Sequence, residues 1–153
     1  MKLYAAYGSN LNIEQMAIRC PRSTIVAAGH IDGFKLVFRG PQNSAVANIE
    51  RTTKKGASVP VLIWKLALTD EVNLDRYEGC PYLYRKTQVC VHQTDDKKQM
   101  AMAYVMNPGP EKNLPSNRYL QTLMDGYDSA GFDMEYLIKA MEQSTTERRK
   151  TRV

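Results

Sequence analysis

The stretch LYAAYGSNLN, residues Leu3 to Asn12, joins a predicted strand to a predicted helix through three turn-forming residues. Gly8, Ser9 and Asn10 are residue types that favour tight turns. A strand that leads through such a turn to a helix start places backbone N–H groups in a concave row, which favours an anion or a polarised carbonyl oxygen. The turn is neither a Walker loop nor a dinucleotide fingerprint, because it lacks a Lys-Ser/Thr pair and has one glycine instead of three. On this pattern alone, a ligand-binding loop and a plain strand-to-helix turn both stay open.

The composition predicts one globular domain in a reducing compartment. The chain has 153 residues, of which 43% are hydrophobic and 24% are charged, as in an ordinary soluble protein. Its three cysteines lie far apart and form no CxxC pair, which argues against a disulfide framework and against a zinc site. No apolar run approaches the roughly 18 residues of a membrane span, and the N-terminus resembles a strand instead of a signal peptide. We therefore expect a cytoplasmic protein without a metal.

The net charge of +5 is concentrated at the C-terminal end of the chain. Residues 147–153 (ERRKTRV) hold four basic residues and one acidic residue, so they carry +3 of that charge. The rest of the chain lacks the basic stripe with interleaved aromatic residues that a nucleic-acid-binding face would show. We predict a solvated basic tail over residues 145–153 and no specific nucleic-acid partner.

Periodicity and turn residues predict an α+β domain over residues 1–144. The expected strands are Lys2 to Tyr7, Ile25 to Ile31, Phe34 to Arg39, Ala45 to Arg51, Val59 to Leu68, Tyr84 to Gln93 and Gln99 to Asn107. The expected helices are Ile13 to Cys20, Asp70 to Glu78, Asn117 to Asp125 and Asp133 to Gln143. Asp32-Gly33 predicts a hairpin turn, and Gly126 and Gly131 are expected to interrupt helices. Short strands with peripheral helices indicate a small, mixed, barrel-like sheet.

A second informative stretch is LDRYEGCPYLYRK, residues Leu74 to Lys86. It places Glu78 in the last turn of a predicted helix, just before Gly79, a residue type that commonly ends helices. Leu74 lies on the same helical face, so Glu78 is expected to point inward. Burial and the negative end of the helix dipole would both raise the pKa of this carboxyl, as general acid–base catalysis requires. The alternative is an exposed glutamate at a helix end with no role.

Taken together, these motifs resemble the gamma-glutamylcyclotransferase family. The resemblance begins with YGSNL and continues through the buried strand and the short helix that ends in Glu-Gly. It includes Tyr104 on the last long strand, Pro115-Ser116 followed by Tyr119, and the closing helix with Tyr136-Leu137. The similarity therefore runs over most of the chain, from about Leu3 to about Met141.

The resemblance implies a fold, a reaction and a set of site residues. The implied fold is a small barrel-like sheet with a pocket at one end. In the implied reaction, the alpha-amine of a gamma-glutamyl compound attacks its own side-chain carbonyl, which yields 5-oxoproline and a free amine or amino acid without metal or cofactor. Glu78 matches the catalytic glutamate, and Tyr104 and Tyr84 are weaker candidates because a strand tyrosine is often only core. The implied substrate-binding residues are Tyr7, Gly8, Ser9, Asn10, Leu11, which packs beneath the loop, and Tyr119.

One departure from the family pattern leaves the leaving group open. Cys80-Pro81 and Leu83-Tyr84 resemble the gamma-glutamylamine cyclotransferase branch, which typically carries threonine where Ser9 stands. The leaving group is then an amino acid, the dipeptide part of glutathione, a lysine side-chain amine or another amine.

Three further alternatives concern the function and the state of the protein. A non-enzymatic binding module of the same fold is the rival interpretation, against which the intact YGSN loop and Glu78 weigh. A catalytic Cys80 is disfavoured, because the sequence places neither His30 nor His92 as its partner. The sequence leaves a monomer and a homodimer equally open.

Overall fold

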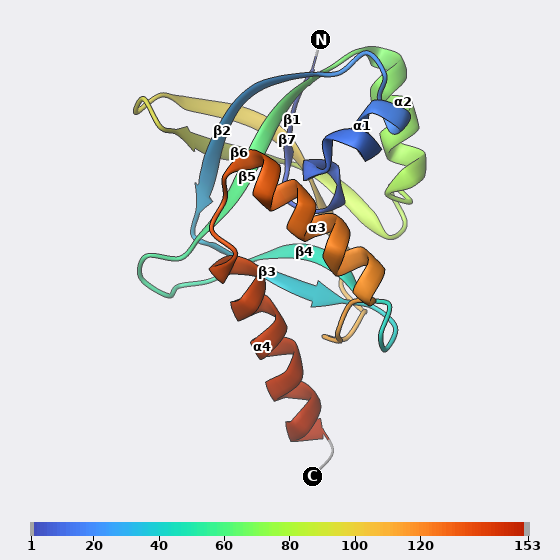
Figure 1. Cartoon of the computed structure of the whole chain (residues 1–153), viewed down its shortest axis with the longest axis vertical. Coiled ribbons are helices and arrows are strands. Elements are labelled where there is room, and N and C mark those ends of the chain that lie inside the picture. Colours follow the sequence, from blue (N-terminus) through green and yellow to red (C-terminus); the bar gives the residue numbers. More distant parts are fainter. Residues whose placement is uncertain (1, 152–153) are drawn as a thin grey trace.

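The protein is a small closed barrel with a second two-stranded sheet and helices packed around it (Figure 1). The computed structural model describes the backbone of residues 2–151 and the side chains of residues 2–144. Within this part of the chain the strands are β1 (Lys2–Ala6), β2 (Thr24–Asp32), β3 (Phe34–Arg39), β4 (Val46–Arg51), β5 (Ser58–Leu66), β6 (Tyr84–Gln93) and β7 (Lys98–Met106). The helices are a 3₁₀-helix, η1 (Ser9–Leu11), and α1 (Ile13–Arg19), α2 (Leu68–Tyr77), α3 (Asn117–Ala130) and α4 (Glu135–Thr151).

The barrel is closed by five strands in the order β1-β5-β2-β6-β7. Neighbouring strands are antiparallel except for β1 and β7, which run parallel and close the ring where Tyr4 faces Met102. Closure removes the unpaired edges of an open sheet. β5 is buried over nearly its whole length, as its continuous apolar sequence predicts. The predicted α+β class with a small mixed barrel is confirmed.

The predicted hairpin at Asp32-Gly33 is wrong. β2 pairs with β5 and β6 in the barrel, whereas β3 pairs with β4 in the separate sheet. Gly33 does adopt the left-handed conformation of a turn residue, with φ of +77°. Its N–H and C=O, however, bond to Ala57 and Thr52, at the two ends of the loop between β4 and β5. The turn therefore sends the chain from one sheet to the other, which local turn chemistry does not distinguish from a hairpin.

The predicted helix break at Gly126 is also wrong, because α3 runs straight through this residue to Ala130. A Cβ at Gly126 would lie 2.8 Å from the Cβ of Leu11 and 2.9 Å from its carbonyl carbon. Glycine is therefore needed here for close approach of α3 to η1 and not for a turn. The other predicted break is confirmed, since Gly131 ends α3 with φ of +73°.

The last helix is longer than the sequence pattern indicates. α4 packs against β3 and continues to Thr151, whereas its predicted end was Gln143. Figure 1 shows it extending away from the barrel toward the C-terminus. The side chains of the predicted basic tail, residues 145–153, lie outside the described part of the structure. Among the described residues, no helix is long and apolar enough to cross a membrane.

Candidate active site

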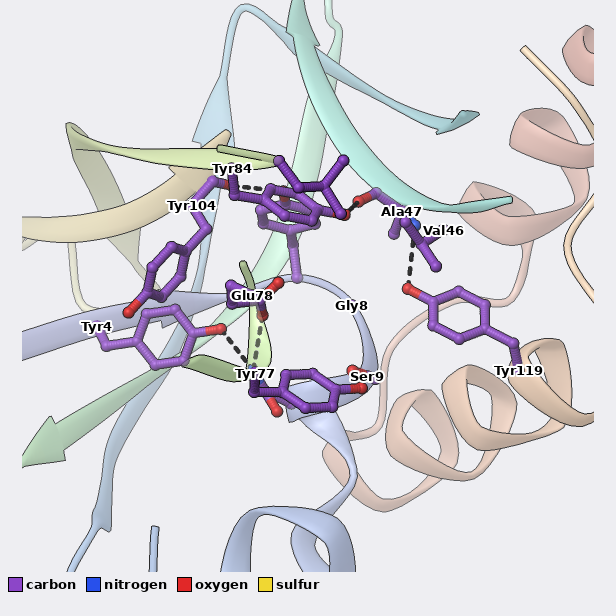
Figure 2. Close-up of a pocket in the computed structure, with 13 residues that line it drawn as sticks. Tyr4, Gly8, Ser9, Val46, Ala47, Tyr77, Glu78, Tyr84, Tyr104 and Tyr119 are labelled. Atoms are coloured by element: carbon purple, nitrogen blue, oxygen red, sulfur yellow. Dashed lines mark hydrogen bonds between the residues drawn. The ribbon is translucent and has the colours of Figure 1, made fainter. Parts of the chain in front are cut away.

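A cavity of about 200 Å³ lies at one end of the barrel, beside the Gly-Ser-Asn turn. Its walls come from the β1–η1 connection, the start of β4, the end of α2, the start of β6 and from β7 and α3, so segments far apart in the sequence meet here (Figure 2). The lining residues are Tyr4, Tyr7, Gly8, Ser9, Asn10, Val46, Ala47, Tyr77, Glu78, Leu83, Tyr84, Tyr104 and Tyr119.

The loop after β1 forms the floor of this cavity. Ser9–Leu11 is one turn of 3₁₀-helix, in which the carbonyl groups of Gly8 and Ser9 accept hydrogen bonds from the N–H groups of Leu11 and Asn12. The first N–H groups of a helix have no partner inside the helix, so the turn presents donors at its N-terminal end. Asn12 then begins α1 by accepting a hydrogen bond from the Gln15 N–H at 3.1 Å. The Asn12 side chain therefore satisfies one of the unpaired N–H groups at the start of α1.

Glu78 is the charged residue in the lining. It caps the C-terminus of α2, and Figure 2 shows its carboxyl pointing into the space between Tyr4, Tyr77 and Tyr84. Burial raises the pKa of the Glu78 carboxyl to about 7, although the nearby Arg19 charge and a hydrogen bond from Asn10 act in the opposite direction. The predicted inward orientation and raised pKa both agree with the structure, and burial is the main cause.

Asn10 and Arg19 fix the orientation of the groups around Glu78. The Asn10 amide donates to Glu78 Oε1 at 3.2 Å and to the Tyr4 hydroxyl at 2.9 Å. Its own oxygen accepts a hydrogen bond from Arg19 Nη1 at 2.6 Å, which sets which way the amide points. The Arg19 guanidinium also stacks on the Tyr77 ring, 3.6 Å from its centroid. Arg19 thus orients the Asn10 amide, and that amide orients the Glu78 carboxyl, without an ion pair between Arg19 and Glu78.

Four of the tyrosines around the cavity act as neutral hydrogen-bonding groups. Burial raises the pKa of Tyr7, Tyr84, Tyr104 and Tyr119 above the usual range of a phenol. Tyr7 donates to the Tyr104 carbonyl at 2.5 Å, and Tyr84 donates to the Ala47 carbonyl at 2.6 Å. The Tyr119 hydroxyl accepts the Ala47 N–H at 3.0 Å, which leaves its own proton available for a ligand.

The structure brings together most of the residues predicted from the sequence. Tyr7, Gly8, Ser9, Asn10, Glu78 and Tyr119 all line the cavity, as do the weaker candidates Tyr84 and Tyr104. Leu11 does not appear among the described lining residues. It is fully buried behind the loop against Gly126, as a residue that packs beneath the loop would be.

Sequence reasoning missed several residues of this site. Tyr4, Tyr77, Val46, Ala47 and Leu83 line the cavity, and Arg19 supports it from α1. The one local signal was closeness in the sequence. Tyr77 directly precedes Glu78, and Tyr4 lies on the strand that leads to Ser9. Val46 and Ala47 come from the second sheet, and no local pattern connects that sheet with the loop.

The described residues do not support Cys80 as a catalytic nucleophile. Burial raises the pKa of the Cys80 thiol, so it stays protonated. His30 and His92 stack on each other, 5.4 Å apart, and both contact Asp32 instead of Cys80. Within the described part of the chain, no group of three His, Cys, Asp or Glu side chains could hold a metal ion.

The fold and this site define a class of small α+β proteins, in which a closed barrel carries a buried carboxyl beside a glycine-containing loop. The sequence model of the AIG2-like family matches residues 58–139, which is more than half of the chain. The chain therefore belongs to the AIG2-like family.

Curated relatives and a solved structure give this assignment more detail. Gamma-glutamylcyclotransferases from Bos taurus and Homo sapiens are each 29% identical to the chain; the alignments cover 88% and 92% of it and 74% and 78% of those relatives. A solved structure described as a gamma-glutamyl cyclotransferase has a TM-score of 0.80 at 27% identity and covers 91% of this chain and 85% of its own. The resemblance to the gamma-glutamylcyclotransferase family noted from the sequence is confirmed.

Proposed function

We propose that this protein is a gamma-glutamylcyclotransferase, which converts a gamma-glutamyl compound to 5-oxoproline and releases its amine. The observation that carries the proposal is the position of Glu78. Its carboxyl has a pKa of about 7 and is hydrogen-bonded to Asn10 of the YGSN loop inside one cavity. The names and the extent of similarity of the curated relatives support the same activity.

The cavity would hold the gamma-glutamyl group in a folded conformation. The N–H groups at the start of η1 and the Tyr119 hydroxyl offer donors to the glutamyl oxygens. Because the attacking amine and the carbonyl belong to the same molecule, correct folding alone can supply an effective concentration on the order of 10⁵ M or more. The loop N–H groups would then stabilise the oxyanion that develops as the ring closes.

Glu78 would carry the proton in both directions. In its ionised form it takes a proton from the alpha-ammonium group, whose ordinary pKa of about 8 lies close to that of Glu78. The freed amine nitrogen forms a bond to the side-chain carbonyl carbon. Bond formation leaves this nitrogen positively charged, so it loses a second proton as the lactam forms. Glu78 returns the first proton to the leaving nitrogen as the bond from the carbon to that nitrogen breaks, and the released amine takes up the second proton to become an ammonium ion. The enzyme ends the cycle in the state in which it began.

The proposal is tested by a panel of gamma-glutamyl compounds assayed for release of 5-oxoproline. The panel contains gamma-glutamyl amino acids, gamma-glutamyl-ε-lysine, gamma-glutamyl alkylamines and glutathione. Release from at least one compound at catalytic enzyme concentration is the expected result. Tight binding of 5-oxoproline or of panel members without any release would contradict the enzyme proposal and identify the alternative, a binding module of the same fold.

The compartment, the oligomeric state and the partners of the protein stay predictions. We propose a cytoplasmic enzyme that needs no cofactor and acts as a monomer or a homodimer on a small gamma-glutamyl substrate, with no specific nucleic-acid partner. The described structure has three free cysteines, in keeping with a reducing compartment. Size measurement in solution distinguishes the two oligomeric states.

A further inference from the structure

A second cavity adjoins the candidate active site. It has a volume of about 500 Å³, and it lies between the loop after β3, the start of β6 and the loop after β7. Val46 and Leu83 line both cavities, so the two spaces meet at these side chains. The first cavity, at about 200 Å³, is smaller than an ordinary ligand pocket of roughly 300–1,000 Å³. It therefore suits one part of a substrate, and the adjoining space can take the rest.

The exposure of the lining residues shows which way a bound molecule would extend. Tyr4 and Tyr104 are 4% and 2% exposed, so they form the closed end of the first cavity. Tyr77 and Leu83 are 47% and 43% exposed, so they lie at its mouth. A gamma-glutamyl group that reaches Glu78 at the closed side directs its amine portion outward, past Leu83. The second cavity lies on the other side of Leu83.

The walls of the second cavity are mainly apolar. Pro41, Val46, Leu83, Met106 and Pro110 contribute the apolar surface, and the polar members of the lining are Arg39, Ser44, Glu111 and Asn113. Such walls gain free energy by contact with apolar groups and lose it by contact with polar groups that find no partner.

The cation in this lining is already engaged. The Arg39 guanidinium forms an ion pair with both carboxylate oxygens of Glu50 and donates to the Pro110 carbonyl at 3.1 Å. An anionic side chain on the leaving group would have to compete with these bonds for Arg39, whereas an apolar side chain leaves them in place.

From these observations we propose that the second cavity is the subsite for the leaving group. It selects gamma-glutamyl compounds whose amine portion carries a bulky apolar side chain, with Val46 and Leu83 as the specificity-determining residues between the two cavities. The inference rests on the proposed cyclotransferase activity and narrows its substrate class.

The test compares leaving groups of matched size on the wild-type protein. Gamma-glutamyl-leucine and gamma-glutamyl-asparagine have side chains of similar shape but different polarity, and gamma-glutamyl-glycine has none. We expect kcat/KM for the leucine compound to exceed each of the other two by about tenfold or more. Equal values, or a higher kcat/KM for gamma-glutamyl-ε-lysine or glutathione than for the leucine compound, would overturn the subsite.

A matched pair of variants locates the preference in this cavity. Ser44 lines the second cavity but not the first, so Ser44→Trp would fill it. We expect the kcat/KM ratio of the leucine to the glycine compound to fall to near one. Gln42→Trp adds the same side chain to the same exposed loop outside both linings and keeps the wild-type ratio. A wild-type ratio in a folded Ser44→Trp protein would contradict the assignment, and thermal unfolding of both variants checks the fold.

These outcomes separate the two proposals. Release of 5-oxoproline without any preference among leaving groups overturns the subsite and leaves the cyclotransferase proposal standing. No release from any panel compound overturns both. If Ser44→Trp does not fold, the substrate series on the wild-type protein still decides the question by itself.

Discussion

Helix α2 carries two glutamates that differ in almost every physical respect. Glu71 in its first turn and Glu78 at its C-terminal end are seven residues apart, so they lie on nearly the same helical face. Glu71 Oε2 contacts Lys2 Nζ at 2.8 Å and Lys86 Nζ at 2.7 Å. Glu78 contacts the neutral amide of Asn10.

The two environments move the two pKa values in opposite directions. Burial acts against ionisation of Glu71, but the bonds from Lys2 and Lys86 outweigh it and lower its pKa. At Glu78 burial prevails and the pKa rises to about 7. A cation in direct contact keeps a carboxylate ionised, so that it serves only to stabilise the structure. Arg19 reaches Glu78 only through Asn10, and the Glu78 carboxyl can therefore still exchange its proton.

The largest expected effect is on turnover. Glu78→Gln keeps the shape of the side chain but removes its proton transfer, so kcat should fall by about 10²–10⁴-fold. The matched variant Glu71→Gln, on the same helix, should keep most of the wild-type kcat. The measurement is 5-oxoproline release from the best substrate of the panel. A loss of less than about tenfold in Glu78→Gln, or an equal loss in both variants, would break the distinction between the two glutamates.

The second effect is on the pH dependence of stability. The pKa of Glu78 is about 7 in the folded protein and near 4.5 in its ordinary state. Below pH 4.5 both states hold the proton and Glu78 costs nothing. As the pH rises to 7, the unfolded chain releases its proton first, and the cost to the folded state grows to about 3 kcal/mol.

Glu78→Gln removes this cost. The variant should match the wild type near pH 4 and exceed its free energy of unfolding by up to about 3 kcal/mol above pH 7. Urea titrations at a series of pH values measure the difference. A difference that is constant with pH would show that the pKa of Glu78 is not raised.

The third effect concerns the cation behind Asn10. Arg19 lowers the pKa of Glu78 through its charge, so Arg19→Gln should move the acid limb of the kcat/KM profile to higher pH by about 1 unit. Arg19→Lys retains the charge but not the planar fork, and its acid limb should stay near that of the wild type. Identical limbs in Arg19→Gln and the wild type would show that Arg19 only supports the fold.

The smallest effect belongs to Glu71. Its lysine partners are partly exposed, with 43% and 29% of their side-chain surface accessible, and ion pairs of this kind contribute about 0.2–1 kcal/mol. Glu71→Gln removes two such pairs, so it should lower the free energy of unfolding by no more than about 2 kcal/mol at neutral pH. Because the pKa of Glu71 is lowered, the contribution is present above its ordinary pKa and disappears in acid. Chemical unfolding at pH 7 and pH 3 tests both statements.

Local patterns made Glu78 a candidate with an inward orientation, and the family resemblance assigned its role and that of the loop, but part of its surroundings could not be predicted. The helix-ending Gly79 and the inward face marked by Leu74 are properties of one short segment. The partners of Glu78 come from β1, η1 and α1, and the side chains opposite it come from β4 and β6. Nothing in the sequence around Arg19 indicates that its guanidinium reaches Asn10, because that contact depends on how α1 packs after the turn.

The fold follows the same division between local and long-range information. The positions of most strands and helices could be predicted, since each has its own periodicity and boundary residues. The pairing of β2 with β5 and β6, and of β3 with β4, could not. A turn at Gly33 is compatible with both arrangements, and the choice between them is made by which sheet buries each apolar face.

The single missing methyl group at Gly126 has a consequence for how the loop can evolve and move. α3 lies directly on Leu11 and Asn12, so the loop has a rigid backing and no room to retreat. A substrate would then meet donors that are already in place, and little ordering entropy would be spent on binding. The same contact restricts position 126 to glycine. Even alanine there would push the backbone of η1 toward the cavity, so a substitution outside the cavity would change the shape of the cavity.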